Sequence, residues 1–243
     1  MSFSHSPRAI TDGLVFYVDA SNPMSYNGSG ATWFDLSGNR NHGTLYNGTL
    51  FSSDKAGTMN FDGTNDYVDC GDIIRGRTQF SAMSWIKTTD TRTGDNQTYK
   101  NPSIFGAQHG SGVSGDFALT LKGGYFGFYH EIGTSGGYGH IETSSYLADN
   151  KWYHIAVTKT TAGDIALYVN GREVYNSPGY AVPLRTSDTT YANWELGRAY
   201  WYGEDASMLR YAGAIANHLF YNRPLSQNEI IQNYEAVKSK FGL

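Results

Sequence analysis

The chain has 243 residues, with 18 basic and 22 acidic side chains and a formal net charge of −4. The charges form no block of either sign, which argues against nucleic acid as a partner, because such proteins carry a clustered basic face. No run approaches the ~18 apolar residues of a membrane span, so we expect no membrane insertion.

The first eleven residues are interpreted as an N-terminal arm (1–11) that precedes one domain (12–243). This arm is either frayed, as chain termini commonly are, or an attachment to another body. The start of the chain has no basic stretch followed by an apolar stretch, so we expect no secretion signal.

Short segments of alternating apolar and polar side chains follow, and each predicts a strand with one buried face. The expected strands lie at about 13–19, 43–50, 57–61, 65–70, 79–88, 102–108, 115–122, 125–131, 139–144, 152–159, 164–170, 172–176, 192–198 and 211–222. The polar stretches 88–101 and 177–190 are expected loops. Cys70 is the one cysteine, and we expect it to be a small buried apolar residue.

The clearest alternation is in the middle of the chain. Ile155 and Val157 share one face of their segment, and Leu167 and Val169 share one face of the next. The pair Asn170-Gly171 is a strong hairpin-turn signal. Two successive hairpins that each have an apolar face need a second sheet to cover it, so the sequence predicts an antiparallel sandwich.

One short helix is expected at the C-terminus. Ser226 and Glu229 have the spacing of a capping box, which marks a helix start. Apolar residues then recur at helical spacing: Ile230, Tyr234, Val237 and Phe241. We expect this stripe to pack on the edge of the sandwich, with a partner protein as the alternative.

Several segments resemble, in order, the laminin-G-like, concanavalin-A-like jelly-roll family. They are residues 61–68 (FDGTNDYV), 80–87 (FSAMSWIK), 151–159 (KWYHIAVTK), 165–174 (IALYVNGREV) and 213–226 with the Glu229-Ile230 pair. The resemblance covers about 12–242 and implies a two-sheet antiparallel jelly-roll sandwich with a short C-terminal helix. It implies little about function, because one fold supports many activities.

Further segments resemble single-domain bacteriophage proteins. They are residues 12–15 (DGLV), 19–23 (DASNP), 25–26 (SY), 33–38 (WFDLSG) and 41–45 (NHGTL). Together with the expected lack of a secretion signal, this resemblance implies a location on the virion surface. An extracellular location is the alternative.

Catalysis is not expected from the sequence. Glucanases of the resembled superfamily carry Glu-x-Asp-x-(x)-Glu on one strand, because alternation then places the carboxylates on one face. None of the seven Glu residues has acidic partners at that spacing within a strand. Glu204 and Asp205 are adjacent, so on a strand they would point to opposite faces.

The resemblance to pentraxin-like relatives implies a calcium site on loops, because calcium prefers carboxylate, amide and carbonyl oxygens. Carried over to this chain, the candidate ligands are Asp116, Glu204 and Asp205. Arg198 and Arg210 flank the second loop and could neutralise its carboxylates instead.

Three consecutive aromatic residues, Tyr200, Trp201 and Tyr202, cannot all face a core, because neighbours on a strand alternate. With Trp194 they are the candidate ligand-binding residues. Packing at the rim, contact with a glycan and contact with a protein all stay open, because Tyr and Trp suit each of them.

We therefore expect a non-enzymatic binding or adhesion module. The first hypothesis is a bacteriophage decoration, fibre or knob protein that recognises a host-surface glycan or another virion protein. A secreted or cell-surface lectin-like domain is the alternative, followed by a polysaccharide hydrolase. Homo-oligomers are common for surface spikes, but no feature of the sequence sets a symmetry.

Overall fold

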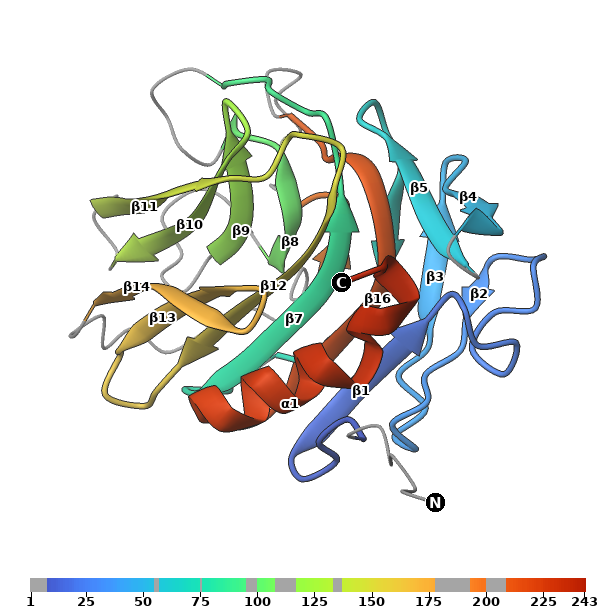
Figure 1. Cartoon of the computed structure of the whole chain (residues 1–243), viewed down its shortest axis with the longest axis horizontal. Helices are drawn as coiled ribbons and strands as arrows, with labels where there is room; N and C mark the ends of the chain where they lie inside the picture. The colour runs from blue at the N-terminus through green and yellow to red at the C-terminus, as the bar shows by residue number, and fades with distance from the viewer. Residues whose placement is uncertain are drawn as a thin grey trace.

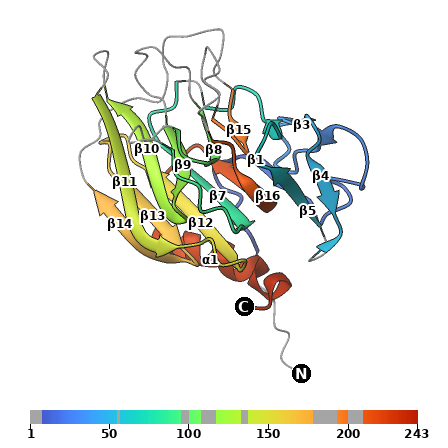
Figure 2. The same cartoon turned by 90° about the horizontal axis from the view of Figure 1, so that it is seen from above.

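The computed structural model describes residues 8–54, 57–74, 76–94, 100–107, 117–132, 137–177, 193–199 and 209–243, with backbone alone for 130–132 and 137–140. These residues form two antiparallel sheets that face each other, with one helix outside them (Figure 1, Figure 2). The arrangement confirms the predicted all-β jelly-roll sandwich with its short C-terminal helix.

Sheet A has the order β14-β13-β12-β7-β16-β5-β4 in the described part of the chain, and β1 pairs with β16. Its strands are β1 (Leu14–Asp19), β4 (Leu50–Ser52), β5 (Thr58–Asp62), β7 (Phe80–Lys87), β12 (Trp152–Lys159), β13 (Ile165–Val169), β14 (Arg172–Ser177) and β16 (Ala212–Tyr221).

Sheet B has the order β11-β10-β9-β8-β15-β6-β3-β2 within the described residues. Its strands are β2 (Thr32–Trp33), β3 (Gly43–Tyr46), β6 (Tyr67–Asp69), β8 (Ser103–Ala107), β9 (Phe117–Lys122), β10 (Tyr125–Ile132), β11 (Gly137–Tyr146) and β15 (Glu195–Leu196).

The alternation predicted in the middle of the chain is confirmed. Ile155, Val157 and Leu167 are fully buried in the core between the sheets, together with most apolar residues of both inner faces. Asn170 and Gly171 have φ values of 51° and 77°, the left-handed values that a tight hairpin turn with a right-handed twist requires.

The expected strand at 43–50 is two strands in different sheets. Asn47 and Gly48 have positive φ values of 60° and 111°, so the chain turns between β3 and β4. β3 then pairs with β6 in sheet B, and β4 pairs with β5 in sheet A. Apolar periodicity missed this turn because the residues on both sides of it continue to alternate.

The helix α1 (Gln227–Val237) begins at the predicted capping box. The Ser226 side chain accepts from the Glu229 N–H, and the Glu229 carboxylate accepts from the Ser226 N–H at 2.8 Å. The expectation that the helix packs on the sandwich edge was wrong, because α1 covers the outer face of sheet A (Figure 2). No helix in the described part of the chain is long and apolar enough to cross a membrane.

Part of the expected N-terminal arm is held against the domain. Ala9 and Ile10 pack on the apolar cluster beneath α1. The Ile10 N–H donates to Asn233 Oδ1 at 2.8 Å, and the Tyr221 hydroxyl donates to the Ile10 carbonyl at 2.9 Å. Residues 8–11 are therefore not frayed, because helix and sheet both bind their backbone.

Candidate functional site

Most predicted site residues lie outside the residues that the structure describes: Tyr200, Trp201, Tyr202, Asp116, Glu204 and Asp205. Their roles in ligand and calcium binding stay predictions. Among the described residues, no group of three or more His, Cys, Asp or Glu side chains could hold a metal ion.

Trp194 is not at the rim, which corrects its assignment as a ligand-binding residue. Its side chain is 0% exposed, and its ring lies 4.9 Å from Phe220 and 5.2 Å from Phe117, centroid to centroid. It precedes β15 and points to the inner face of sheet B. A ring with no exposed surface cannot stack on a sugar, so Trp194 is a core residue.

Trp194 supplies a hydrogen-bond partner for His218, the buried histidine of β16. The indole Nε1–H donates to His218 Nε2 at 2.9 Å, and His218 Nδ1 lies 2.8 Å from Ser84 Oγ. An indole N–H can only donate, so Nε2 accepts and Nδ1 carries the proton, which it donates to Ser84. Burial lowers the pKa of His218 to about 3. This chain of hydrogen bonds connects the two sheets through the core.

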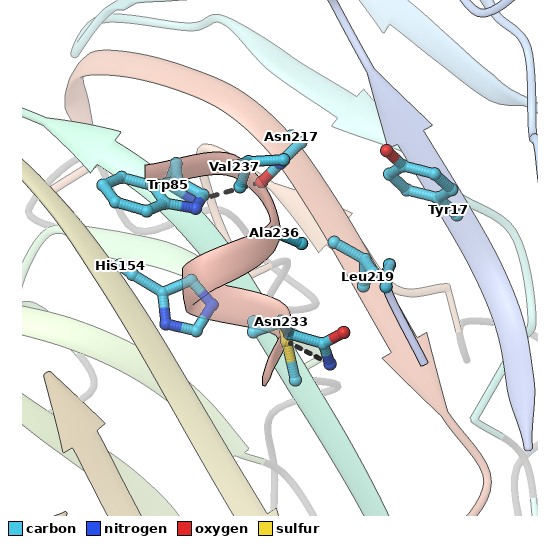
Figure 3. A pocket seen from close by; sticks show the side chains of 10 residues that line it. Tyr17, Trp85, His154, Asn217, Leu219, Asn233, Ala236 and Val237 are labelled. Atoms are coloured by element: carbon cyan, nitrogen blue, oxygen red, sulfur yellow. Dashed lines mark hydrogen bonds between the residues drawn. The ribbon is translucent and has the colours of Figure 1, made fainter. Parts of the chain in front are cut away.

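His154 on β12 is buried, with 2% of its surface exposed. It points out of β12 into a cavity of about 10 Å³ beneath α1, beside Trp85 and Asn233 (Figure 3). Burial lowers its pKa to about 3. His154 is buried because the helix covers this face of sheet A, with Tyr234 of α1 against the imidazole. The cavity is far below ligand size.

A larger hollow of about 620 Å³ lies between α1 and the turn of the β13–β14 hairpin. Its walls include Ile231 and Tyr234 of the helix and Val174 of β14. The size suits a ligand, but none of the residues that line it is a buried charged group. The residues that line this hollow therefore offer no buried charge that would orient a polar ligand.

The outer face of sheet B carries a row of polar and aromatic side chains, and the register of the paired strands explains why they share this face. Glu195 on β15 pairs with Asp69 on β6, which pairs with Thr44 on β3. Two residues along the same two strands, Tyr67 pairs with Tyr46. Directly paired residues point to the same face of a sheet, and the intervening residues of these strands point into the core. We call this group the sheet B site.

Tyr67 lies at the centre of a stack in the sheet B site. Its ring is parallel to Tyr46, with 4.6 Å between centroids and 6° between planes. The guanidinium carbon of Arg198 lies 3.4 Å from the Tyr67 ring centroid, an attractive cation–π contact. β6 lies between β3 and β15, so Tyr46 and Arg198 approach Tyr67 from opposite sides. Tyr46 is 40% exposed and presents this stack to solvent.

Glu195 holds Arg198 over the stack. The Nε–H and Nη2–H groups of Arg198 donate to the two Glu195 oxygens at 2.9 and 2.8 Å. Glu195 is 4% exposed, and this burial raises its pKa to about 7, although Arg198 opposes the shift. Asp69 also raises the pKa of Glu195, and Arg210 lowers it.

Asp69 lies next to the stack. Among the hydrogen bonds described for its carboxylate, none comes from a cationic side chain. Its oxygens accept from the Gly71 N–H and from Asn193 Nδ2, both at 2.8 Å. Asp69 and the exposed Asn193 therefore offer acceptors and donors on the same face of sheet B as the Tyr46 ring, which offers an apolar surface. Such a combination suits a ligand with hydroxyl groups and an apolar ring face.

Sequence patterns alone did not single out the sheet B site, although residues 67–69 carry a local signal for it. Val68 belongs to the core, so Tyr67 and Asp69 must point outward. Which residues of other strands lie beside them depends on strand order. Glu195 is distant from Asp69 in the chain and adjacent to it only because β15 pairs with β6.

Comparisons with known proteins agree with this fold. The model of the concanavalin A-like lectin/glucanases superfamily matches residues 62–231, more than half of the chain. No curated protein matches the sequence.

Several solved structures share the architecture. Domain 4 of AbnA, an extracellular arabinanase from Geobacillus stearothermophilus solved with arabinotriose, is 17% identical with a TM-score of 0.68, covering 91% of this chain and 98% of that one. The binding domain of Paraclostridial Mosquitocidal Protein 1 is 18% identical with a TM-score of 0.64, covering 92% and 52%. Trypanosoma rangeli sialidase, solved with sialic acid, is 15% identical with a TM-score of 0.67, covering 98% and 36%.

The chain covers very different shares of these three solved structures. The chain spans about half of the toxin binding domain and about a third of the sialidase, whereas it matches nearly all of the arabinanase domain. At these identities the likeness shows a shared fold.

Proposed function

The chain belongs to the concanavalin A-like lectin/glucanases superfamily, and from this premise we propose that it is a non-catalytic module that binds glycans at the sheet B site. The observation that carries the proposal is the stack of Tyr46, Tyr67 and Arg198 beside Asp69. A sugar ring has an apolar face that packs on aromatic rings and hydroxyl groups that pair with carboxylates and amides. The arabinanase domain of the same fold was solved with arabinotriose, which supports a sugar ligand.

The test compares two exposed tyrosines that both lie in ring pairs. Tyr46→Ala removes the exposed end of the stack, whereas Tyr125→Ala removes a 42% exposed ring from a T-shaped pair with Tyr146 at 5.3 Å. We expect wild type to bind members of a neutral glycan array. Tyr46→Ala should lose about tenfold in affinity, or about 1.4 kcal/mol, and Tyr125→Ala should bind as wild type does. Equal affinity of all three proteins would refute the sheet B site.

The carboxylates favour a glycoside hydrolase as the second candidate. Glu195 pairs across strands with Asp69, and its pKa is raised to about 7, which suits a general acid. Against hydrolysis, both oxygens of Glu195 are engaged by Arg198. Release of reducing ends from arabinan or β-glucan by wild type, abolished in Glu195→Gln, would establish the hydrolase and end the non-catalytic proposal.

The biological setting is a separate proposal: a virion surface, where the module contacts a host glycan or another virion protein. It rests on the resemblance of residues 12–45 to bacteriophage proteins. The protein should sediment with purified particles, and a label on it should appear at the particle surface in electron micrographs. Secretion by uninfected cells would favour the extracellular alternative. Ultracentrifugation of the isolated protein would decide whether it forms homo-oligomers.

Calcium also remains a proposal, with Asp116, Glu204 and Asp205 as its ligands. The described residues neither complete nor oppose such a site, so the proposal rests on the family resemblance. Titration calorimetry should show calcium binding that Asp205→Asn weakens. The absence of heat with wild type would exclude it.

A further inference from the structure

The arginine of the sheet B site is bound by its own chain. Two of its N–H groups form a fork with the two oxygens of Glu195, at 2.9 and 2.8 Å. The fork is largely desolvated, since the side chains of Arg198 and Glu195 are 12% and 5% exposed. The positive charge of Arg198, which lies against the aromatic stack, is therefore already paired with Glu195 in the absence of a ligand.

The charges around this pair are of both signs. Asp69 lies directly across the strand pair from Glu195, and Arg210 is close enough to lower the pKa of Glu195. A ligand that brought a further carboxylate would meet the carboxylates of Asp69 and Glu195, and it would find the fork of Arg198 already occupied by Glu195.

We infer that Glu195 is a specificity-determining residue of the proposed glycan site, which selects uncharged sugars over sugars that carry a carboxylate because Glu195 occupies the fork of Arg198. The inference rests on the proposed function, since it names the class of glycan that the same site takes. Its physical basis is competition. Arginine binds carboxylates through two parallel hydrogen bonds, and here an internal carboxylate already makes them.

The test removes the charge of Glu195 and keeps its shape. Glu195→Gln is compared with wild type and with Glu173→Gln, which changes an exposed glutamate on β14 outside the site. The probes are glucose- and galactose-based trisaccharides in matched pairs that differ only in oxidation of one C6 hydroxymethyl to a carboxylate. At pH 8, where Glu195 is charged, we expect wild type and Glu173→Gln to prefer the neutral member, and Glu195→Gln to shift toward the acidic member by on the order of tenfold.

A second measurement needs no sugar. Acetate is titrated while the Arg198 Nε–H signal is followed by nuclear magnetic resonance. In wild type at pH 8 the signal should not respond, whereas in Glu195→Gln it should shift as acetate binds to the fork. If that variant does not fold, wild type at pH 6 replaces it, since the pKa of about 7 for Glu195 leaves the carboxyl largely protonated there.

The two measurements separate the two proposals. Sugar binding with an unchanged neutral-to-acidic ratio in Glu195→Gln refutes the role of Glu195 and leaves the glycan site standing. Binding of no sugar by wild type, with a gain of acetate affinity in Glu195→Gln, refutes the glycan site and leaves the charge-matching role of Glu195. A silent Arg198 signal in every protein and at both pH values refutes that role.

Discussion

At the scale of single residues, the decisive positions are polar groups whose partners lie far away in sequence. His218 is fully buried in the core, and it is tolerated there because Trp194 and Ser84 satisfy both ring nitrogens. Glu195 is tolerated in the same way by Arg198. Each polar group is costly to bury alone and stable as part of a pair.

The Trp194–His218 hydrogen bond gives a prediction for stability. His218→Leu leaves a buried indole N–H without an acceptor, so it should lower the free energy of unfolding by about 1–3 kcal/mol. Trp194→Phe should also destabilise, but the double variant should lose at least about 1 kcal/mol less than the two single losses together. Urea unfolding of the four proteins measures this coupling, and additive losses would show that the bond contributes little.

At the scale of elements, the helix converts the sandwich into three layers. α1 and the following turn, Lys238–Phe241, cover apolar residues on the outer face of sheet A, including Trp85 and Trp152. Phe241 stacks on Trp85 at 4.1 Å and lies 4.7 Å from Trp152, centroid to centroid. The C-terminal segment therefore contributes core packing even though it lies outside both sheets.

Phe241→Ala tests that role. The ring is 8% exposed and packs against two tryptophans, so its removal should cost about 3 kcal/mol of unfolding free energy and make Trp85 more accessible to acrylamide quenching. Leu243→Ala is the matched control, because Leu243 is two residues further along and 52% exposed. A similar small loss in both variants would mean that the helix end is not part of the core.

At the scale of the whole molecule, buried titratable groups tie stability to pH. His154 lies beneath α1 and His218 between the sheets, and burial lowers the pKa of each to about 3 from an ordinary 6.5. Between these values the unfolded chain binds more protons than the folded one, so both histidines reduce stability as the pH falls below 6.5. Glu195 acts oppositely between its ordinary 4.5 and about 7, where the folded state binds the extra proton.

Between pH 6.5 and 4.5, the two histidines therefore lower the free energy of unfolding as the pH falls, whereas Glu195 raises it. The free energy of unfolding should fall by about 1.4 kcal/mol for each pH unit in this window. Glu195→Gln removes the opposing group, so its slope between pH 6.5 and 4.5 should be about twice that of wild type. Urea unfolding at half-unit steps of pH measures both slopes, and a flat wild-type profile would contradict the neutral state of the two histidines.

Much of the fold could be predicted from the sequence, because alternation within a strand and capping at a helix start are local. Strand positions, the turn at Asn170-Gly171 and the helix beginning after Ser226 follow from neighbours a few residues apart. The burial of Cys70 was predicted from its residue type, because free cysteine is among the most often buried side chains.

The tertiary structure alone decided which faces are covered and which side chains meet. Helix placement on sheet A buried His154, and the inward direction of Trp194 removed it from the predicted site. The pairing of β15 with β6 brought Glu195 beside Asp69. The physical reason is that periodicity tells a residue's face within its own strand, whereas strand order and layer stacking depend on the free energy of the whole packed chain.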